Sequence, residues 1–212
     1  MKQLKDIKLL LIDMDNTLCD THHSLSIPQW KKVEKTLVAM GKPDHADTFR
    51  KAFGKFSFMH TLESLDMSKS EKIKCIKAYD SVDVKNLELY PDAKYIFNLE
   101  MTKVLVTRGE PELQRRKIKH LGIAEYFDKI YFVHTFDSKR DAFKKAMRDF
   151  KVKSGECLAI GDRIEEEILD ANELHIPSVL VRRPDWPVHK DHGRPDMTVR
   201  SLEAVAKRLN NH

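Results

Sequence analysis

The feature of this sequence that most constrains its fold is a series of very short aliphatic segments in which nearly every residue is apolar. Strands of this kind are buried on both faces, which is typical of a parallel sheet covered by helices on each side. Five segments fit, at residues 8–12, 103–106, 130–133, 158–160 and 178–181. They predict an α/β fold built on a doubly wound parallel sheet.

Helical patterns separate the later segments, as such a sheet requires. A helix is expected to begin at Pro111 and to end at Gly122, because proline suits the first turn and glycine the end of a helix. Ser138 with Asp141 three residues later predicts a capping box for the next helix. Apolar spacing predicts further helices within residues 164–174 and 202–209. The basic, proline-containing residues 182–194 are expected to cover an edge of the sheet.

Residues 20–87 show no strand pattern and interrupt the alternation. They carry helical spacing, as at Trp30, and a second capping box at Ser68 and Glu71. A crossover between parallel strands needs only one helix, so we expect residues 20–87 to be an inserted helical subdomain, with 1–19 and 88–212 forming the core. Its aromatic and sulfur-containing side chains are expected to be mainly core; they include Trp30, Phe56, Phe58 and Met59.

Composition excludes several classes of protein. Hydrophobic residues make up 41% of the 212 residues, enough for a core, but no stretch of about 20 apolar residues could cross a membrane. Three scattered cysteines form no disulfide or zinc pattern, and no secretory signal is recognised, so a cytoplasmic location is expected. The net charge of +5 comes from basic residues mixed with acids, which argues against a nucleic-acid partner and favours a small anionic substrate.

Polar residues follow the strand segments at the edge of the sheet where ligands bind. In an open α/β sheet, this edge lies at the carboxyl ends of the strands. Four segment ends therefore offer carboxylates, a hydroxyl and an ammonium to one site. Asp13, Asp15 and Thr17 follow the first segment, Thr107 and Arg108 the second, and Lys139 the third. The fourth segment is followed by Gly161, Asp162, Glu165, Glu166 and Glu167.

These residues, in this order, resemble the four motifs of the haloacid dehalogenase superfamily of hydrolases, and the resemblance covers nearly the whole chain. It implies a Rossmann-like core with a helical cap that closes over the site and selects the substrate. It also implies an Mg²⁺-dependent phosphatase acting on a small phosphorylated metabolite. The motif residues are Asp13, Asp15 and Thr17, then Thr107, then Lys139, and finally Gly161 with Asp162.

The resemblance assigns a role to each motif residue. Asp13 would be the nucleophile that forms an aspartyl-phosphate, and Asp15 the general acid and base. Thr107 and Lys139 would contact the transferring phosphoryl group, and Arg108 would either reach substrate or pair with an acid. The Mg²⁺ ligands would be Asp13, the backbone carbonyl of Asp15 and Asp162. The later acid of the fourth motif is usually Asp in the family; here Glu167 is favoured over Glu166 for that position, either as a metal ligand or through a metal-bound water.

Several alternatives remain open at the level of sequence. A phosphomutase or other phosphotransferase would share every catalytic residue, and a binding protein could retain a vestigial site. A dehalogenase would need neither a metal nor the second acid, so Asp15 and Asp162 argue against it. Lys117 and Lys119 are set aside as the catalytic ammonium because both lie inside a helix, away from the mouth of the site. His22 and His23 are candidates to face the leaving group. The chain could be a monomer or a homodimer.

Overall fold

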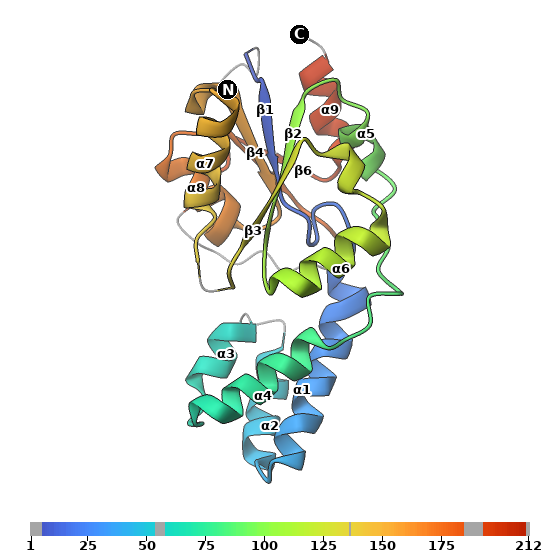
Figure 1. Ribbon diagram of the computed structural model, residues 1–212, viewed down its shortest axis with the longest axis vertical. Helices are drawn as coiled ribbons and strands as arrows, with labels where there is room; N and C mark the ends of the chain where they lie inside the picture. Colours follow the sequence, from blue (N-terminus) through green and yellow to red (C-terminus); the bar gives the residue numbers. More distant parts are fainter. Residues whose placement is uncertain (1–5, 54–57, 136, 185–192, 211–212) are drawn as a thin grey trace. The chain divides into compact units, whose positions relative to one another are not determined.

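A computed structural model describes residues 6–53, 58–135, 137–184 and 193–210. The chain divides into two compact units: a core unit of Met1–Asp20 with Leu87–His212, and a helical unit of Thr21–Asn86 (Figure 1). Over these described stretches, no helix combines the length and the apolar character needed to span a bilayer.

The core unit contains a six-stranded sheet in the order β3-β2-β1-β4-β5-β6, with every neighbouring pair parallel. This confirms the predicted doubly wound sheet. The sixth strand was not predicted, because it is short, alternates with an exposed Thr198 and pairs only with β5 at the sheet edge. The strands are β1 (Leu9–Ile12), β2 (Thr102–Arg108), β3 (Lys129–Val133), β4 (Cys157–Gly161), β5 (Ser178–Val181) and β6 (Met197–Val199).

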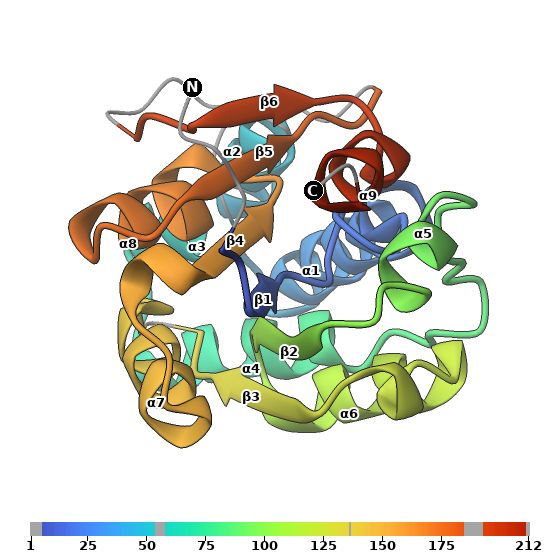
Figure 2. The same ribbon diagram turned by 90° about the horizontal axis from the view of Figure 1, so that it is seen from above.

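Helices cover both faces of this sheet, which explains why its central strands are apolar on every residue. Figure 2 shows α7 and α8 on one face and α5, α6 and α9 on the other. Leu9 and Leu11 pack toward α7, together with Phe143 and Ala146 from that helix. The helices are α5 (Ala93–Phe97), α6 (Pro111–Leu121), α7 (Arg140–Phe150), α8 (Leu169–Glu173) and α9 (Leu202–Asn210).

Two predicted helix boundaries have different outcomes. Helix α6 begins at Pro111 and is ended by Gly122 at φ 64°, as expected. The capping box at Ser138 and Asp141 is wrong, because Lys139 is the N-cap and α7 begins at Arg140. The Ser138 hydroxyl instead donates to Asp170 Oδ1 at 2.8 Å and accepts from the Arg140 N–H at 3.0 Å. The Ser138 hydroxyl therefore combines a local contact at the start of α7 with a tertiary contact to Asp170 of α8.

The helical unit has its own aromatic core. Trp30 stacks on Phe49 at 4.1 Å between ring centroids, and Phe58 stacks on Tyr79 at 4.0 Å. The Ser68–Glu71 capping box of α4 is present. Phe58 and Met59 pack against this core, whereas Phe56 lies outside the described residues, as do 185–192 of the segment expected at the sheet edge. Its helices are α1 (Ile27–Ala39), α2 (Pro43–Ala52), α3 (Phe58–Ser64) and α4 (Lys69–Asp80).

Candidate active site

Strand register brings the ends of β1, β2 and β4 to the same level. Ile12 lies opposite Leu105 of β2 and Ile160 of β4, and the Asp13 N–H donates to the Ile160 carbonyl at 2.9 Å. Asp13, Thr107 and Asp162 therefore lie at one edge of the sheet, and all three are buried. This edge is the carboxyl end of the strands, where ligands of open α/β sheets bind.

The loop after β1 folds back on itself beside β4. The Leu18 N–H donates to the Met14 carbonyl at 2.9 Å, and Asn16 adopts a positive φ of 57°, which asparagine tolerates better than most residues. This turn brings the Thr17 hydroxyl to Asp162, where it donates to Oδ1 at 3.3 Å. Thr17 of the first motif thereby contacts Asp162 of the fourth motif.

Lys139 lies at the centre of the site with 2% of its surface exposed. Its ammonium donates to Asp13 Oδ1 and to Glu167 Oε1. Burial acts to lower the pKa of Lys139, but Asp13 and Glu167 outweigh burial and raise that pKa above its ordinary value. Lys139 therefore stays charged over the physiological pH range and offsets negative charge at Asp13.

The site holds more carboxylates than this one ammonium can neutralise. Burial raises the pKa of Asp13, and Lys139 opposes that shift. Burial also raises the pKa of Asp162 well above its ordinary range, and the charges of Asp13 and Glu167 add to the effect. For Glu167, burial raises the pKa to about 7 against the pull of Lys139. Concentrated, desolvated carboxylates of this kind are typical of functional sites.

The donor set fits a hard divalent cation. Asp162 Oδ2 is buried and accepts no hydrogen bond, and the nearby Asp13 supplies a second carboxylate. Within the described residues, no three His, Cys, Asp or Glu side chains are grouped to hold one ion. Mg²⁺ does not need three, because it commonly takes one or two carboxylates and keeps several waters. Oxygen donors with an orphaned buried carboxylate oxygen are therefore compatible with Mg²⁺.

The acids of the fourth motif lie on a π-helical turn, Ile164–Ile168, which buries both Glu166 and Glu167. Sequence periodicity could not separate these two residues, because a π turn does not follow the α-helical repeat. Glu167 contacts Lys139 and also accepts from the Arg163 N–H at 3.2 Å. Both carboxylate oxygens of Glu167 therefore accept hydrogen bonds from the protein. Its role as a metal ligand stays a prediction.

Glu166 instead pairs with two guanidinium groups. Its Oε1 accepts from the Arg108 guanidinium, and Arg163 Nη1 lies 2.6 Å from the same oxygen. Burial would raise the pKa of Glu166, but Arg163 and Arg108 lower it below its ordinary value. Arg108 therefore takes the acid-pairing alternative of the two considered for it, with 28% of its side chain still exposed.

Helix α6 contributes two contacts that the sequence did not reveal. The Lys117 ammonium lies 2.9 and 3.0 Å from the two carboxylate oxygens of Asp15. Gln114 lies one turn earlier and accepts from the Thr107 hydroxyl at 3.2 Å. The expectation that Lys117 lies away from the site was wrong. A position inside a helix does not remove a long side chain from the strand ends, and only the packing of α6 shows which face it turns to the sheet.

A buried arginine stabilises the loop of the first motif through a main-chain contact. Arg183 follows β5 and binds both carboxylate oxygens of Asp92 at 2.8 and 2.9 Å and the Thr17 carbonyl at 2.5 Å. Its guanidinium also lies 3.9 Å from the ring centroid of Tyr90. The sequence offered only the presence of arginines after the last predicted strand as a signal for this contact.

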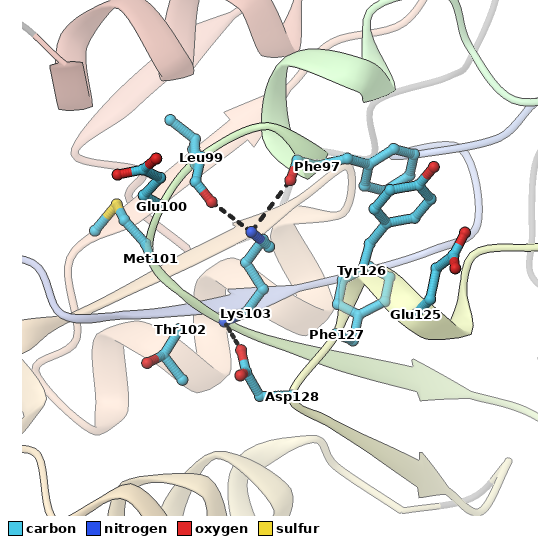
Figure 3. Close-up of a pocket in the computed structure, with 10 residues that line it drawn as sticks. All are labelled: Phe97, Leu99, Glu100, Met101, Thr102, Lys103, Glu125, Tyr126, Phe127 and Asp128. Atoms are coloured by element: carbon cyan, nitrogen blue, oxygen red, sulfur yellow. Dashed lines mark hydrogen bonds between the residues drawn. The ribbon is translucent and has the colours of Figure 1, made fainter.

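A separate cavity of about 510 Å³ lies at the opposite end of β2. Figure 3 shows Lys103 pointing toward the carbonyl oxygens of Phe97 and Leu99, to which its ammonium donates at 3.2 and 2.5 Å. Glu125 and Tyr126 also line this cavity. Because the lysine is engaged by main-chain oxygens and acids surround it, this cavity is a poor site for a phosphate group.

A family model described as haloacid dehalogenase-like hydrolase matches residues 7–171. The chain belongs to the haloacid dehalogenase-like hydrolases. A second family model, described as HAD-hydrolase-like, matches residues 138–205. Together these matches cover both units and all four motifs, so this haloacid dehalogenase-like hydrolase is an enzyme of the hydrolase class.

Known proteins resemble this hydrolase over most of its length. A glyceraldehyde 3-phosphate phosphatase of Pyrococcus furiosus is 26% identical over 197 residues, covering 83% of this chain and 81% of the relative. A haloacid dehalogenase-like family protein, SP0104 of Streptococcus pneumoniae, shares the fold with a TM-score of 0.73 and 20% identity, covering 95% and 98% of the two chains. The HAD-hydrolase YfnB of Bacillus subtilis, solved bound to magnesium, gives a TM-score of 0.68 at 17% identity, covering 97% and 100%.

Proposed function

We propose that this protein is an Mg²⁺-dependent phosphatase that hydrolyses a small phosphorylated metabolite through an aspartyl-phosphate on Asp13. The observation that carries the proposal is the buried Lys139 ammonium held between Asp13 and Glu167. An ammonium in this position reduces the repulsion between the Asp13 carboxylate and a phosphate ester. The names of the relatives support the phosphatase activity.

The reaction divides into two displacements. In the first, a carboxylate oxygen of Asp13 forms a bond to phosphorus, the ester P–O bond breaks, and Asp15 gives its proton to the departing oxygen. In the second, a water oxygen attacks the same phosphorus, the bond to Asp13 breaks and Asp15 takes the water proton. Inorganic phosphate and the free carboxylate of Asp13 are the products.

The surrounding side chains orient and neutralise these reacting groups. Lys139 offsets charge on Asp13 and on the transferring phosphoryl oxygens. The Thr107 hydroxyl, which donates to Gln114 Oε1 in this structure, would turn to donate to one of those oxygens when substrate is bound. Asp13, the Asp15 carbonyl and Asp162 would hold Mg²⁺, with Glu167 acting through a water or through Lys139. When bound, Mg²⁺ supplies positive charge that draws the ester phosphate and the carboxylates together.

We assign substrate choice to the helical unit, on the basis of connectivity. The chain leaves the core unit at Asp20, shortly after Asp15, and returns at Leu87. An insertion tethered next to the reacting groups is suited to act as a cap. Given the relatives, three-carbon sugar phosphates such as glyceraldehyde 3-phosphate are the first substrates to examine.

The test is release of inorganic phosphate from a panel of phosphate esters, with 4-nitrophenyl phosphate as the generic member. We expect hydrolysis with Mg²⁺, loss on chelation, and recovery when Mg²⁺ is restored. Asp13→Asn should abolish turnover, whereas Asp141→Asn, at an acid whose side chain is 94% exposed, should leave it unchanged. Full activity of Asp13→Asn would refute the assignment. Conversion of a sugar phosphate to its positional isomer would indicate a phosphomutase, and transfer of phosphate to a second sugar without release would indicate a phosphotransferase.

A further inference from the structure

A buried lysine on α6 contacts the proposed general acid. Lys117 has 3% of its surface exposed, and its ammonium lies 2.9 and 3.0 Å from the two oxygens of Asp15. Asp15 is less enclosed, with 24% of its side chain exposed. Lys117 thus holds the Asp15 carboxylate while part of the Asp15 side chain stays exposed.

Stability alone does not explain this lysine. Leu113, one turn before Lys117 on the buried face of α6, is apolar, so an apolar side chain at position 117 would fit the helix pattern. A buried ion pair is often no more stabilising than an apolar replacement, because both charges must lose water. The ammonium is therefore better explained by what it does to Asp15.

Gln114 extends the contact to the second motif. Its amide nitrogen lies 3.4 Å from Asp15 Oδ2 and donates to the Arg108 carbonyl at 3.0 Å, while its amide oxygen accepts from the Thr107 hydroxyl at 3.2 Å. Gln114 and Lys117 are three residues apart and so share one face of α6. The helix thereby fixes Asp15 relative to Thr107, the proposed partner of the phosphoryl oxygens.

We propose that Lys117 is a positioning residue for Asp15, assisted by Gln114, and that it holds the Asp15 carboxyl toward the departing oxygen of the ester. The inference rests on the proposed function, because it concerns the proton that Asp15 gives to that oxygen. Lys117 itself contacts neither phosphorus nor the nucleophile. It acts by restricting the rotation of Asp15: in the acid form one Asp15 oxygen still accepts from the Lys117 ammonium while the other carries the proton, so the proton donor is already in place when the P–O bond breaks.

Dependence on the leaving group provides the test. Phenyl phosphate releases a basic oxygen that needs a proton, whereas 2,4-dinitrophenyl phosphate releases an oxygen that does not. We expect Lys117→Met to lower kcat/KM for phenyl phosphate by about 10- to 100-fold. The value for the dinitrophenyl ester should change little. Lys119→Met, at an exposed lysine of the same helix, is the matched control and should retain both activities.

A double variant separates positioning from folding. If Lys117 acts through Asp15, then adding Lys117→Met to Asp15→Ala should cause no further loss on phenyl phosphate. Equal losses on both esters, multiplicative losses in the double variant, or full activity of Lys117→Met would each overturn the inference. If the wild-type protein hydrolyses neither ester with Mg²⁺, the proposed function fails and this inference with it, which distinguishes that result from failure in the variant alone.

Discussion

Gly161 ends β4 directly beneath the Glu167 side chain, and this contact yields a quantitative prediction. A Cβ at position 161 would lie 2.4 Å from Glu167 Cγ and 2.6 Å from its Oε2. Atoms cannot approach this closely, so Glu167 would have to leave its place against Lys139 and the Arg163 N–H. Overpacking of a buried site costs about 1–3 kcal/mol in the free energy of unfolding. At about 2–4 °C per kcal/mol for a chain of this size, Gly161→Ala should lower the Tm by about 2–12 °C.

Activity should fall more steeply than stability. Displacing Glu167 releases one of the two carboxylates that hold Lys139, and misplacing a catalytic group by about 1 Å can cost on the order of 100-fold in rate. The assays are thermal unfolding and initial rates of phosphate release at saturating Mg²⁺. Gly155→Ala is the matched control, because a Cβ there would meet no atom within 4 Å. A Gly161→Ala protein with wild-type Tm and turnover would refute this account of the packing.

Three further perturbations test other parts of the structure. Lys139→Met leaves Asp13 and Glu167 buried without their cation, so unfolding experiments in urea should show a loss of about 3–5 kcal/mol together with loss of phosphatase activity. Arg183→Met removes the guanidinium that pairs with Asp92 and supports the Thr17 carbonyl, and should lower the free energy of unfolding by about 3 kcal/mol, measured in the same way. Hydrogen bonds from Lys129 and Tyr131 lower the pKa of Asp149 in the folded protein. The stability that Asp149 contributes is therefore fully present above its unfolded-state pKa of about 3.9, and it is lost as the pH falls through the lower folded-state pKa. The urea midpoints of wild type and Asp149→Asn should therefore differ near neutral pH and converge in acid, and a gap unchanged down to about pH 2 would contradict the assignment.

The fold could be predicted largely from local patterns. Strands buried on both faces must be apolar throughout, so segments such as residues 9–12 and 158–160 are visible in the sequence. The α6 boundaries at Pro111 and Gly122 were equally local, because each depends on the backbone preference of one residue. β6 was not predicted, because an edge strand with an exposed face carries no continuous run of apolar residues. The Ser138 capping box failed because α7 begins at Arg140 with Lys139 as its N-cap, while the Ser138 hydroxyl donates to a distant Asp170.

The candidate site shows the same division. The order of Asp13, Asp15, Thr107, Lys139 and Asp162 along the chain was sufficient to predict a common edge of the sheet, because parallel strands end on the same side. Sequence could not assign partners among charged side chains, as it offers several acids and bases of equal standing. A π turn and the packing of α6 decided which ion pairs form. These pairs are Glu167 with Lys139, Glu166 with Arg108, and Asp15 with Lys117.

The sequence by itself therefore determined the parallel sheet except for its edge strand β6, the residues at its carboxyl edge and the family, since these depend on short-range periodicity and on chain order. Only the tertiary structure decided which carboxylate each cation contacts. The physical reason is that the pairing of long charged side chains depends on helix rotation and burial, which arise from contacts between residues such as Lys117 and Asp15 that are far apart in the chain.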